Sequence, residues 1–368
     1  MEIQCQRLSR ALAARGHAVT VLTERSQSDN RDTQEAGVRV IRYRPWGSPP
    51  WSSFLSGLRM FFYLLKDRAF DIYHAHMLAT PALVALWIGK ILKKPVLVKV
   101  AGAGHTGDLG TSRRLWRGPA KIALFKKNVQ HVVCPSETTL EEFRQLGISE
   151  NALHQIPNGI DTRQFWPATP EEQKQSRATL RLPPERLIAV YAGRWAPGKG
   201  VERLLDAWEK GAADAEFRWD LILLLADAEK AAADAPSRWR SLGNRVHIFH
   251  NVTDLLPYYH ASDLAVLLSD AEGLSNLLLE TMACGLPSLT TSPAAITPHQ
   301  DRDNWSWIVD RSPEEVVTQL RNLQNDPGVL RLKGASARRK VEDSFSMDKT
   351  AAAYENLYQQ MQTLTLPR

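Results

Sequence analysis

The 368-residue chain has few cysteines and lacks an uninterrupted apolar run long enough to span a membrane. Its three cysteines, Cys5, Cys134 and Cys284, are far apart and form no Cys-x-x-Cys pair. Neither a disulfide framework nor a zinc knuckle is therefore predicted, and a reducing compartment is favoured. The first residues also lack the basic, apolar and small-residue order of a signal peptide. We expect a cytoplasmic protein that is soluble or peripheral on the inner face of the membrane.

The chain has no strong excess of either charge. Its 46 Lys and Arg residues against 40 Asp and Glu residues give a net charge of +6, which is informative only where basic residues cluster. With 43% hydrophobic and 23% charged residues, the composition is that of a globular protein and excludes wholesale disorder and collagen. Since a single core stops growing at roughly 250 to 300 residues, two domains are expected.

Short β-branched segments alternate with segments of helical periodicity in both halves of the chain, a pattern typical of parallel sheets covered on both faces. The predicted strands are residues 18–23, 38–43, 72–74, 96–100 and 131–134, and then residues 187–192, 221–225, 246–249, 264–268 and 287–290. Between the two sets, residues 157–170 are rich in Pro, Asn, Asp and Gly, as expected of a linker. The sequence thus predicts two α/β domains.

The most informative stretch is residues 270–287, in which a predicted strand is followed by a polar loop and a helix. Gly273 and Ser275 are near the start of this helix, so its first backbone amides are available to an anion. Glu272 lies in the loop and Glu280 about one turn into the helix. The two carboxylates therefore address different parts of one ligand, such as sugar and ribose hydroxyls. The alternative is an ordinary capped helix with solvated acids.

A second candidate site is the Gly- and Pro-rich loop of residues 193–200, which follows a predicted strand. Its Arg194 and Lys199 suit a diphosphate whose negative charge grows as a bond to it breaks. The spacing is not that of a Walker loop, and two solvated cations on a surface turn are the alternative. Both candidate loops follow strands of one domain, and open α/β sheets bind ligands at the carboxyl ends of their strands.

Together these residues resemble the retaining glycosyltransferases of family 4. The resemblance covers nearly the whole chain, and its motifs are Pro157-Asn-Gly-Ile-Asp161 with Phe165, Gly193-Arg194 with Lys199-Gly200, Glu272 and Glu280 separated by seven residues, and Ala283-Cys-Gly-Leu-Pro287. It implies the GT-B fold, an α/β architecture of two Rossmann-like domains with parallel sheets that face each other across a cleft. By the resemblance, residues 1–165 bind the acceptor, residues 166–345 bind the nucleotide sugar, and residues 346–368 form a helix that packs back on the first domain.

The resemblance also implies a metal-independent hexosyltransferase without a cofactor. A sugar moves from a nucleotide-diphosphate donor, UDP- or GDP-linked, to a lipid-linked or surface-polysaccharide acceptor, with retention at the anomeric carbon. By position, Arg194 and Lys199 hold the diphosphate and Glu272 holds the sugar, and these three are the catalytic candidates. The other donor-binding candidates are Gly193, Gly273, Leu274, Ser275, Asn276 and Glu280, the last of them at the ribose. Such a reaction belongs to polysaccharide or lipopolysaccharide biosynthesis.

The sequence departs from the family pattern at several glycines. The family begins with a strand and a Gly-Gly loop, whereas this sequence reads Met1-Glu2 at the start of a predicted helix. We therefore expect the first strand to be missing, through a short translated start or a decayed protein. A glycine-rich turn of the family is replaced by Ala226-Asp-Ala-Glu229, and a later Gly-Gly by Ala294-Ala295. Each change adds a Cβ where a backbone approaches closely, so donor affinity or identity is expected to differ.

The sequence is also compatible with two functions other than sugar transfer. A catalytically silent nucleotide-sugar-binding or scaffold protein is favoured by the missing strand and the lost glycines. Within enzymes, the alternative is an epimerase or phosphorylase with the same fold.

Three residues are candidates on the acceptor side of the reaction. His76 follows a predicted strand, and His105 and Asp108 lie in a glycine-rich turn after residues 96–100. A single loop histidine is as often without function as functional. His74 and His76 are not expected to bind a metal, because we place their rings on opposite faces at the end of the strand.

Two stretches suggest an acceptor at a membrane. The segment from Trp46 to Leu65 is rich in aromatic and aliphatic residues, and the segment from Arg113 to Lys127 is basic and has no acid. Together they indicate a surface that meets anionic headgroups; a core-facing helix with snorkelling lysines is the alternative. No recognition-helix or base-stacking motif accompanies the basic stretch, so no nucleic-acid partner is expected.

Overall fold

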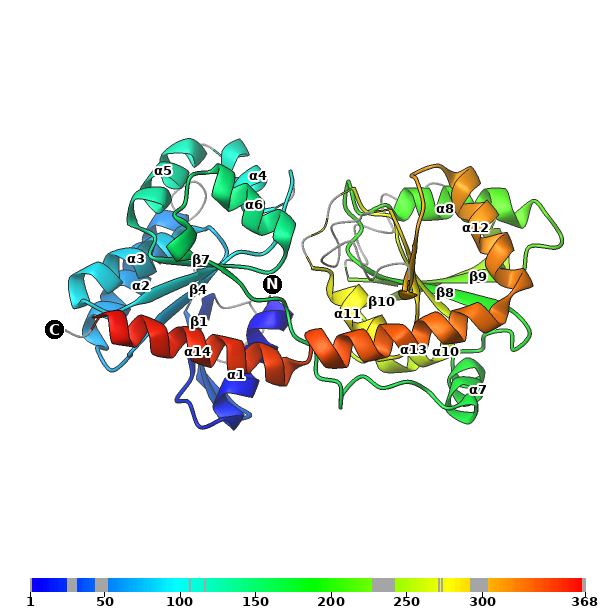
Figure 1. Ribbon diagram of the computed structural model, residues 1–368, viewed down its shortest axis with the longest axis horizontal. Coiled ribbons are helices and arrows are strands. Elements are labelled where there is room, and N and C mark those ends of the chain that lie inside the picture. The colour runs from blue at the N-terminus through cyan, green and yellow to red at the C-terminus, as the bar shows by residue number, and fades with distance from the viewer. Residues whose placement is uncertain are drawn as a thin grey trace. The chain divides into compact units, whose positions relative to one another are not determined.

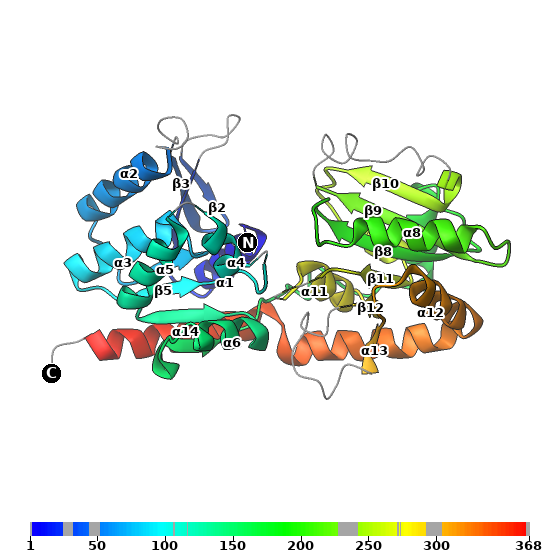
Figure 2. The ribbon, with the colours of Figure 1, turned by 90° about the horizontal axis from the view of Figure 1, so that it is seen from above.

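The computed structural model describes residues 2–24, 32–43, 52–105, 107–115, 117–226, 242–270, 272, 274–291 and 304–365. The chain forms two compact units, one made of Met1–Gly159 with Met347–Arg368 and the other of Ile160–Ser346. Each unit has its own parallel sheet and its own hydrophobic core (Figures 1 and 2).

The first unit contains a four-stranded parallel sheet and a smaller three-stranded sheet. The larger sheet has the order β4 (Tyr73–His76), β5 (Val96–Lys99), β6 (His131–Cys134) and β7 (Leu153–Gln155). The smaller sheet has the order β1 (Thr20–Glu24), β3 (Val38–Tyr43) and β2 (Asp32–Glu35), with β1 parallel and β2 antiparallel to β3. β2 and β7 are not among the predicted strands, because both are short, partly exposed and without a β-branched run.

Helices cover both faces of the four-stranded sheet. Alternate residues of a strand point to opposite faces, so the residues of β5 contribute to an apolar cluster on each side of the sheet. Val96 and Val98 of β5 pack in one apolar cluster with residues of five helices, and Leu97 packs in another with two helices. The first set is α2 (Ser52–Lys66), α3 (Thr80–Leu92), α4 (Asp108–Arg114), α5 (Gly118–Asn128) and α6 (Glu137–Gln145). The second set is α1 (Glu2–Ala14) and α14 (Met347–Thr365), so the last helix completes the core of the first unit.

A buried polar group lies between the four-stranded sheet and this second helix layer. The Lys99 side chain is 1% exposed, and its Nζ donates to Asn158 Oδ1 at 2.7 Å. Burial lowers the pKa of Lys99 to about 8, an effect that the Cys5 thiol opposes. Since Asn158 directly precedes the point where the chain leaves the unit, this bond fixes the start of the linker.

The second unit is built on a six-stranded parallel sheet. Its strands lie in the order β10 (Val246–His250), β9 (Trp219–Leu225), β8 (Leu187–Gly193), β11 (Leu264–Leu267), β12 (Ser288–Thr290) and β13 (Ser306–Ile308). The chain order of the strands reverses between β8 and β11, and open α/β sheets bind ligands beyond the carboxyl ends of the strands at such a point. The topology therefore favours a ligand site after Gly193 and Leu267.

Six helices of the second unit bear on the site or the core. They are α7 (Pro170–Thr179), α8 (Val201–Ala212), α10 (Leu256–Ala261), α11 (Asn276–Ala283), α12 (Pro313–Asn325) and α13 (Pro327–Ser344). Local sequence explains where α7 begins, because Thr169 and Glu172 form a capping box and Pro170 occupies the first turn.

The core of the second unit contains a charge that is fully paired. Asp220 lies on the buried strand β9 and is 0% exposed, and its two oxygens are bonded by Arg186 and by His247 Nε2, the latter at 3.1 Å. A buried carboxylate is tolerated only with such partners. Beside it, Trp219 Nε1 donates to Leu320 O at 2.8 Å and joins β9 to α12.

The chain passes between the units earlier than the predicted boundary at residue 165, because Ile160 and Phe165 are buried in the core of the second unit, at 0% and 4% exposure. Ile160 N donates to Phe345 O at 2.9 Å there. In the first unit, Thr350 Oγ1 donates to Pro157 O at 3.4 Å. Each crossing is thus held by hydrogen bonds within the unit to which it belongs.

None of the helices in the described ranges combines the length and the apolar character needed to cross a bilayer.

The lowered pKa of Lys99 predicts that the stability of the protein depends on pH. This pKa falls from the ordinary 10.5 to about 8 on folding, so the folded state binds fewer protons between these values and gains stability as the pH rises through them. We expect the melting temperature of the wild-type protein minus that of Lys99→Met to increase from about pH 7.5 to about pH 9.5, since only the wild-type protein carries the amine. A difference that stays constant over this range would contradict the lowered pKa.

Candidate functional site

The loops that follow β8 and β11 lie against each other where the strand order reverses. Asp270 N donates to Gly198 O at 2.8 Å. The two motifs that we predicted to share a ligand are therefore brought into direct contact.

At this junction Lys199 and Glu272 form an ion pair. Lys199 Nζ and Ser269 Oγ both donate to Glu272 Oε1, each at 2.8 Å. The lysine and glutamate side chains are 24% and 12% exposed, so water screens this pair less than it screens a surface pair. A phosphate that reaches Lys199 therefore has to compete with the carboxylate.

Arg194 is the exposed cation of the same loop. The Tyr191 hydroxyl fixes the backbone at this point by donating to Arg194 O at 3.3 Å. Burial raises the pKa of Tyr191, and the Glu272 carboxylate adds to the effect, so the hydroxyl stays protonated and keeps its role as donor. The loop thus holds Lys199 on Glu272 and leaves Arg194 open to an incoming ligand.

The junction of the two loops depends on glycine. Gly200 has a φ of 76° at the N-cap of α8, and a Cβ at this position would lie 2.1 Å from Leu268 O. A Cβ at Gly193 would lie 2.6 Å from the Tyr191 hydroxyl. A side chain at Gly193, a donor-binding candidate, would therefore displace the Tyr191 hydroxyl.

The start of α11 provides backbone amides beside this junction. Ser275 is the N-cap, and its side chain makes no capping hydrogen bond. Leu274 and Ser275 are buried, and Asn276 is half-buried. The positive end of the helix dipole lies here and attracts an anion. Gly273, the remaining candidate of this stretch, lies outside the described residues.

Glu280 lies on the second turn of α11 and is 3% exposed. Tyr259, on α10, donates to its Oε2 at 2.7 Å. The carboxylate is therefore anchored in the interior of the unit, and its contact with a ribose stays a prediction.

Two arginines that the sequence analysis did not single out hold the loop after β11. Arg203 of α8 forms an ion pair with Asp270 at 2.6 Å and donates to Leu268 O at 2.9 Å. Arg311 donates to Asp270 O at 3.2 Å. The sequence holds one signal for Arg203, which lies on the first turn of the helix that follows Lys199. Arg311 is brought to the loop only by the tertiary fold.

The acceptor-side candidates lie in the first unit. The rings of His74 and His76 are stacked with centroids 4.5 Å apart, so the prediction that they face opposite ways is wrong: residues two apart on a strand share a face. Burial lowers the pKa of His74 to about 3, with Lys99 as the second cause. Burial also holds the pKa of His76 well below its usual value, and His74 and Lys99 contribute. Both imidazoles are therefore neutral near pH 7.

Asp108 holds the loop after β5. It is 6% exposed, its Oδ1 accepts from Leu78 N at 2.6 Å, and its Oδ2 accepts from Ala101 N at 2.5 Å. Both oxygens of this carboxylate are thus bonded to backbone amides, and its part on the acceptor side stays a prediction. His105, at the tip of the same loop, is exposed.

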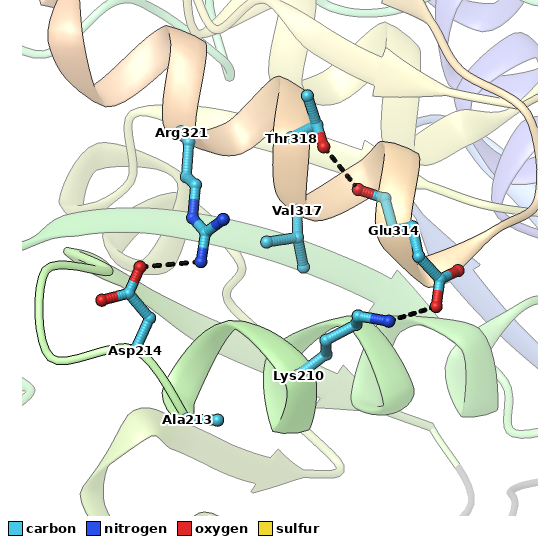
Figure 3. A pocket seen from close by; sticks show the side chains of 7 residues that line it. All are labelled: Lys210, Ala213, Asp214, Glu314, Val317, Thr318 and Arg321. Carbon is cyan, nitrogen blue, oxygen red and sulfur yellow. Dashed lines mark hydrogen bonds and ion pairs between the residues drawn. The ribbon is translucent and has the colours of Figure 1, made fainter.

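A surface hollow lies between α8 and α12 of the second unit (Figure 3), and none of the candidate site residues lines it. Its walls carry the ion pairs Lys210–Glu314 and Arg321–Asp214, the latter at 2.7 Å. Since the charges on its walls neutralise one another, the hollow offers little to a charged ligand.

The family follows from comparison of the sequence with known families. The pattern of Glycosyltransferase Family 4 matches residues 1–164, and that of Glycosyl transferases group 1 matches residues 186–326. The chain belongs to glycosyltransferase family 4. An uncharacterized glycosyltransferase of Methanocaldococcus jannaschii is 22% identical to it over 378 residues, covering 97% of this chain and 93% of that protein.

Solved structures agree with the predicted GT-B fold of this glycosyltransferase. Anabaena Alr3699/HepE, in complex with UDP and glucose, has a TM-score of 0.78 and 15% identity, covering 97% of this chain and 95% of that one. WaaG, a glycosyltransferase involved in lipopolysaccharide biosynthesis, has a TM-score of 0.74 and 16% identity, with coverage of 97% and 95%. The α/β fold class is therefore confirmed.

The loop junction makes Gly200 of this glycosyltransferase sensitive to substitution. We expect Gly200→Ala to lower the free energy of unfolding by more than about 2 kcal/mol, because the positive φ and the contact with Leu268 O both oppose a Cβ. Denaturant unfolding measures the loss. Gly243→Ala is the matched control, since Gly243 also has a positive φ but an added Cβ there meets nothing within 4 Å. Equal losses for the two variants would mean that the contact with Leu268 O is unimportant.

Proposed function

We propose that this glycosyltransferase moves a hexose, with retention, from a UDP- or GDP-linked donor to a lipid-linked or surface-polysaccharide acceptor. The observation that carries the proposal is the Lys199–Glu272 pair, with Arg194 on the same loop, at the reversal of the strand order. The structural similarity to HepE with its UDP and glucose supports a nucleotide-sugar donor. The similarity to WaaG supports an acceptor in glycan biosynthesis.

Donor binding exchanges the partners of the ion pair. The diphosphate takes Lys199 and Arg194, and Glu272, released from Lys199, accepts hydrogen bonds from the hydroxyls of the sugar. Hydrogen bonds to charged groups contribute roughly 1.5 to 3 kcal/mol each, so an exchange that forms several of them is favourable. Ser269 also donates to Glu272 Oε1 and keeps the carboxylate in place while its partner changes.

The same groups act in the chemical step. The bond between the anomeric carbon and the diphosphate oxygen breaks, and the acceptor hydroxyl oxygen forms a bond to that carbon on the same face. The leaving diphosphate gains negative charge, which Arg194, Lys199 and the first amides of α11 stabilise. Its oxygen takes the proton of the acceptor hydroxyl. In this proposal these groups supply the positive charge that a divalent cation supplies in other transferases.

The acceptor is proposed to bind at the carboxyl ends of β4 and β5. His76 lies there with a neutral ring, and the exposed His105 lies on the loop that Asp108 holds. A neutral imidazole both donates and accepts hydrogen bonds, which suits the hydroxyl groups of a glycan. Asp108 then acts on the acceptor only through the shape of this loop.

Arg194→Ala is predicted to weaken UDP binding by about 1 to 3 kcal/mol, or roughly 5- to 150-fold, because a charge-assisted bond to the diphosphate is lost. Isothermal titration with UDP measures the change. Arg321→Ala removes a cation of the same unit that is paired with Asp214, and we expect it to leave the affinity unchanged. Wild-type affinity in Arg194→Ala would remove this residue from the diphosphate site.

Glu272→Gln is predicted to separate binding from transfer. Without the carboxylate Lys199 is released, so the affinity for UDP, which has no sugar, rises severalfold. Transfer from the UDP- or GDP-sugar falls by about 100-fold or more, because the charged acceptor of the sugar hydroxyls is lost. Titration with UDP and turnover of labelled donor in the presence of a lipid extract measure the two effects. A variant that transfers at the wild-type rate would contradict the role of Glu272.

The same assays separate the silent nucleotide-sugar-binding alternative. A wild-type protein that binds UDP but turns over no hexose donor would favour it. A protein that binds neither UDP nor GDP would overturn both functions.

A further inference from the structure

An exposed apolar stripe runs along α2 and α3 of the first unit. Phe54, Leu58 and Phe62 follow one another at intervals of four residues on α2, with 62%, 42% and 58% exposure. Trp87 and Ile91 have the same spacing on α3, with 53% and 52% exposure. Residues four apart share a helix face, and the two helices pack side by side (Figures 1 and 2). We call these five residues the apolar stripe.

Other residues of the two helices attach them to the unit. Leu64 of α2 and Ile88 of α3 are buried in the core cluster, and a Cβ added at Gly57 would lie 2.8 Å from Thr80 Cγ2. The helices thus approach each other through small residues and reach the sheet through separate aliphatic ones. The large side chains of the stripe are not used by this packing, and exposed apolar side chains on neighbouring helices are typical of a binding face.

The charged residues on the two helices of the stripe and on the neighbouring α5 are all basic. The helices α2, α3 and α5 contain no Asp or Glu, and α5 packs against α3 (Figure 2). Their basic residues are Arg59, Lys66, Lys90, Lys121, Lys126 and Lys127. All of these except the half-buried Lys121 are exposed. Asp71, which follows α2, is paired with Lys94 at 3.6 Å.

We propose that the apolar stripe inserts into the headgroup region of an anionic lipid bilayer and that the basic residues of α2, α3 and α5 contact the lipid phosphates. Aromatic and aliphatic side chains flanked by cations, without acids, have the composition of an interfacial helix. Trp and Phe are suited to the boundary between water and hydrocarbon. The absence of Asp and Glu from these three helices matches the negative charge of the lipid phosphates.

The structure changes the surface that the sequence predicted. Trp46, Trp51 and Trp116 lie outside the described residues. Trp87 and Ile91, which no sequence motif singled out, join the α2 part of the predicted segment. Insertion of the apolar stripe into a bilayer needs neither the nucleotide-sugar donor nor the sugar acceptor. Its test is therefore independent of the transfer reaction.

Flotation with phosphatidylcholine vesicles, with and without phosphatidylglycerol, tests the proposal. We expect the wild-type protein to float with the anionic vesicles, to bind the neutral vesicles at least about tenfold more weakly, and to be released by salt. The triple variant Phe54→Ser, Phe62→Ser, Trp87→Ser is expected to bind anionic vesicles at least about tenfold more weakly than the wild type, because three inserted side chains are lost. Its UDP affinity and melting temperature report whether it remains folded.

Leu332→Ser is the matched control, since Leu332 on α13 of the other unit is 72% exposed, and we expect it to bind vesicles as the wild type does. Failure of the wild-type protein to bind anionic vesicles would overturn the proposal. Full vesicle binding by the triple variant would overturn it as well, and so would equal binding of the wild type to neutral vesicles. A triple variant that changes only the sedimentation mass of the protein would assign the stripe to a contact between copies of the chain and would also overturn it.

Discussion

The packing of the loop after β8 on the loop after β11 is the constraint on which the candidate site of the second unit depends. Gly198 O accepts from Asp270 N, and Gly200 passes Leu268 O at a distance that leaves no room for a Cβ. Arg203 and Arg311 hold Asp270 from different elements. Because the two loops follow neighbouring strands, Lys199 and Glu272 lie within hydrogen-bonding distance. This contact requires no distortion of α8 or α11, which are both regular helices.

The first unit uses the two faces of one sheet for different purposes. On the face toward α1 and α14, the strands carry Lys99, His74 and His76, and Lys99 ties the sheet to the linker through Asn158. On the other face Val96 and Val98 are in a wholly apolar cluster. Since that cluster holds α2 and α3 by aliphatic and small residues, their outer faces are left free to carry residues that the fold does not need.

The sequence predicted most of the strands, because buried parallel strands are runs of β-branched and aliphatic residues. It missed β2, β7 and β13, which have three or four residues each. These strands form through pairing with a neighbouring strand and not through a strong local pattern. It located the loops of Arg194, Lys199 and Glu272, since Gly and Pro punctuate the ends of strands. Whether Lys199 bonds to Glu272, or Asp108 to the amides of its own loop, depends on strand order and loop closure, which local spacing does not contain.

The closed ion pair also has a consequence for the order of binding and release in the proposed reaction. A ligand that separates Lys199 from Glu272 must provide a new partner for each charged group. A partly buried charge without a partner has a large cost in free energy. A nucleotide sugar satisfies both, with its phosphate at Lys199 and its hydroxyls at Glu272. The nucleoside diphosphate left after transfer satisfies only Lys199, so re-formation of the ion pair favours its departure. The ion pair that resists separation when no ligand is bound therefore promotes release of the product.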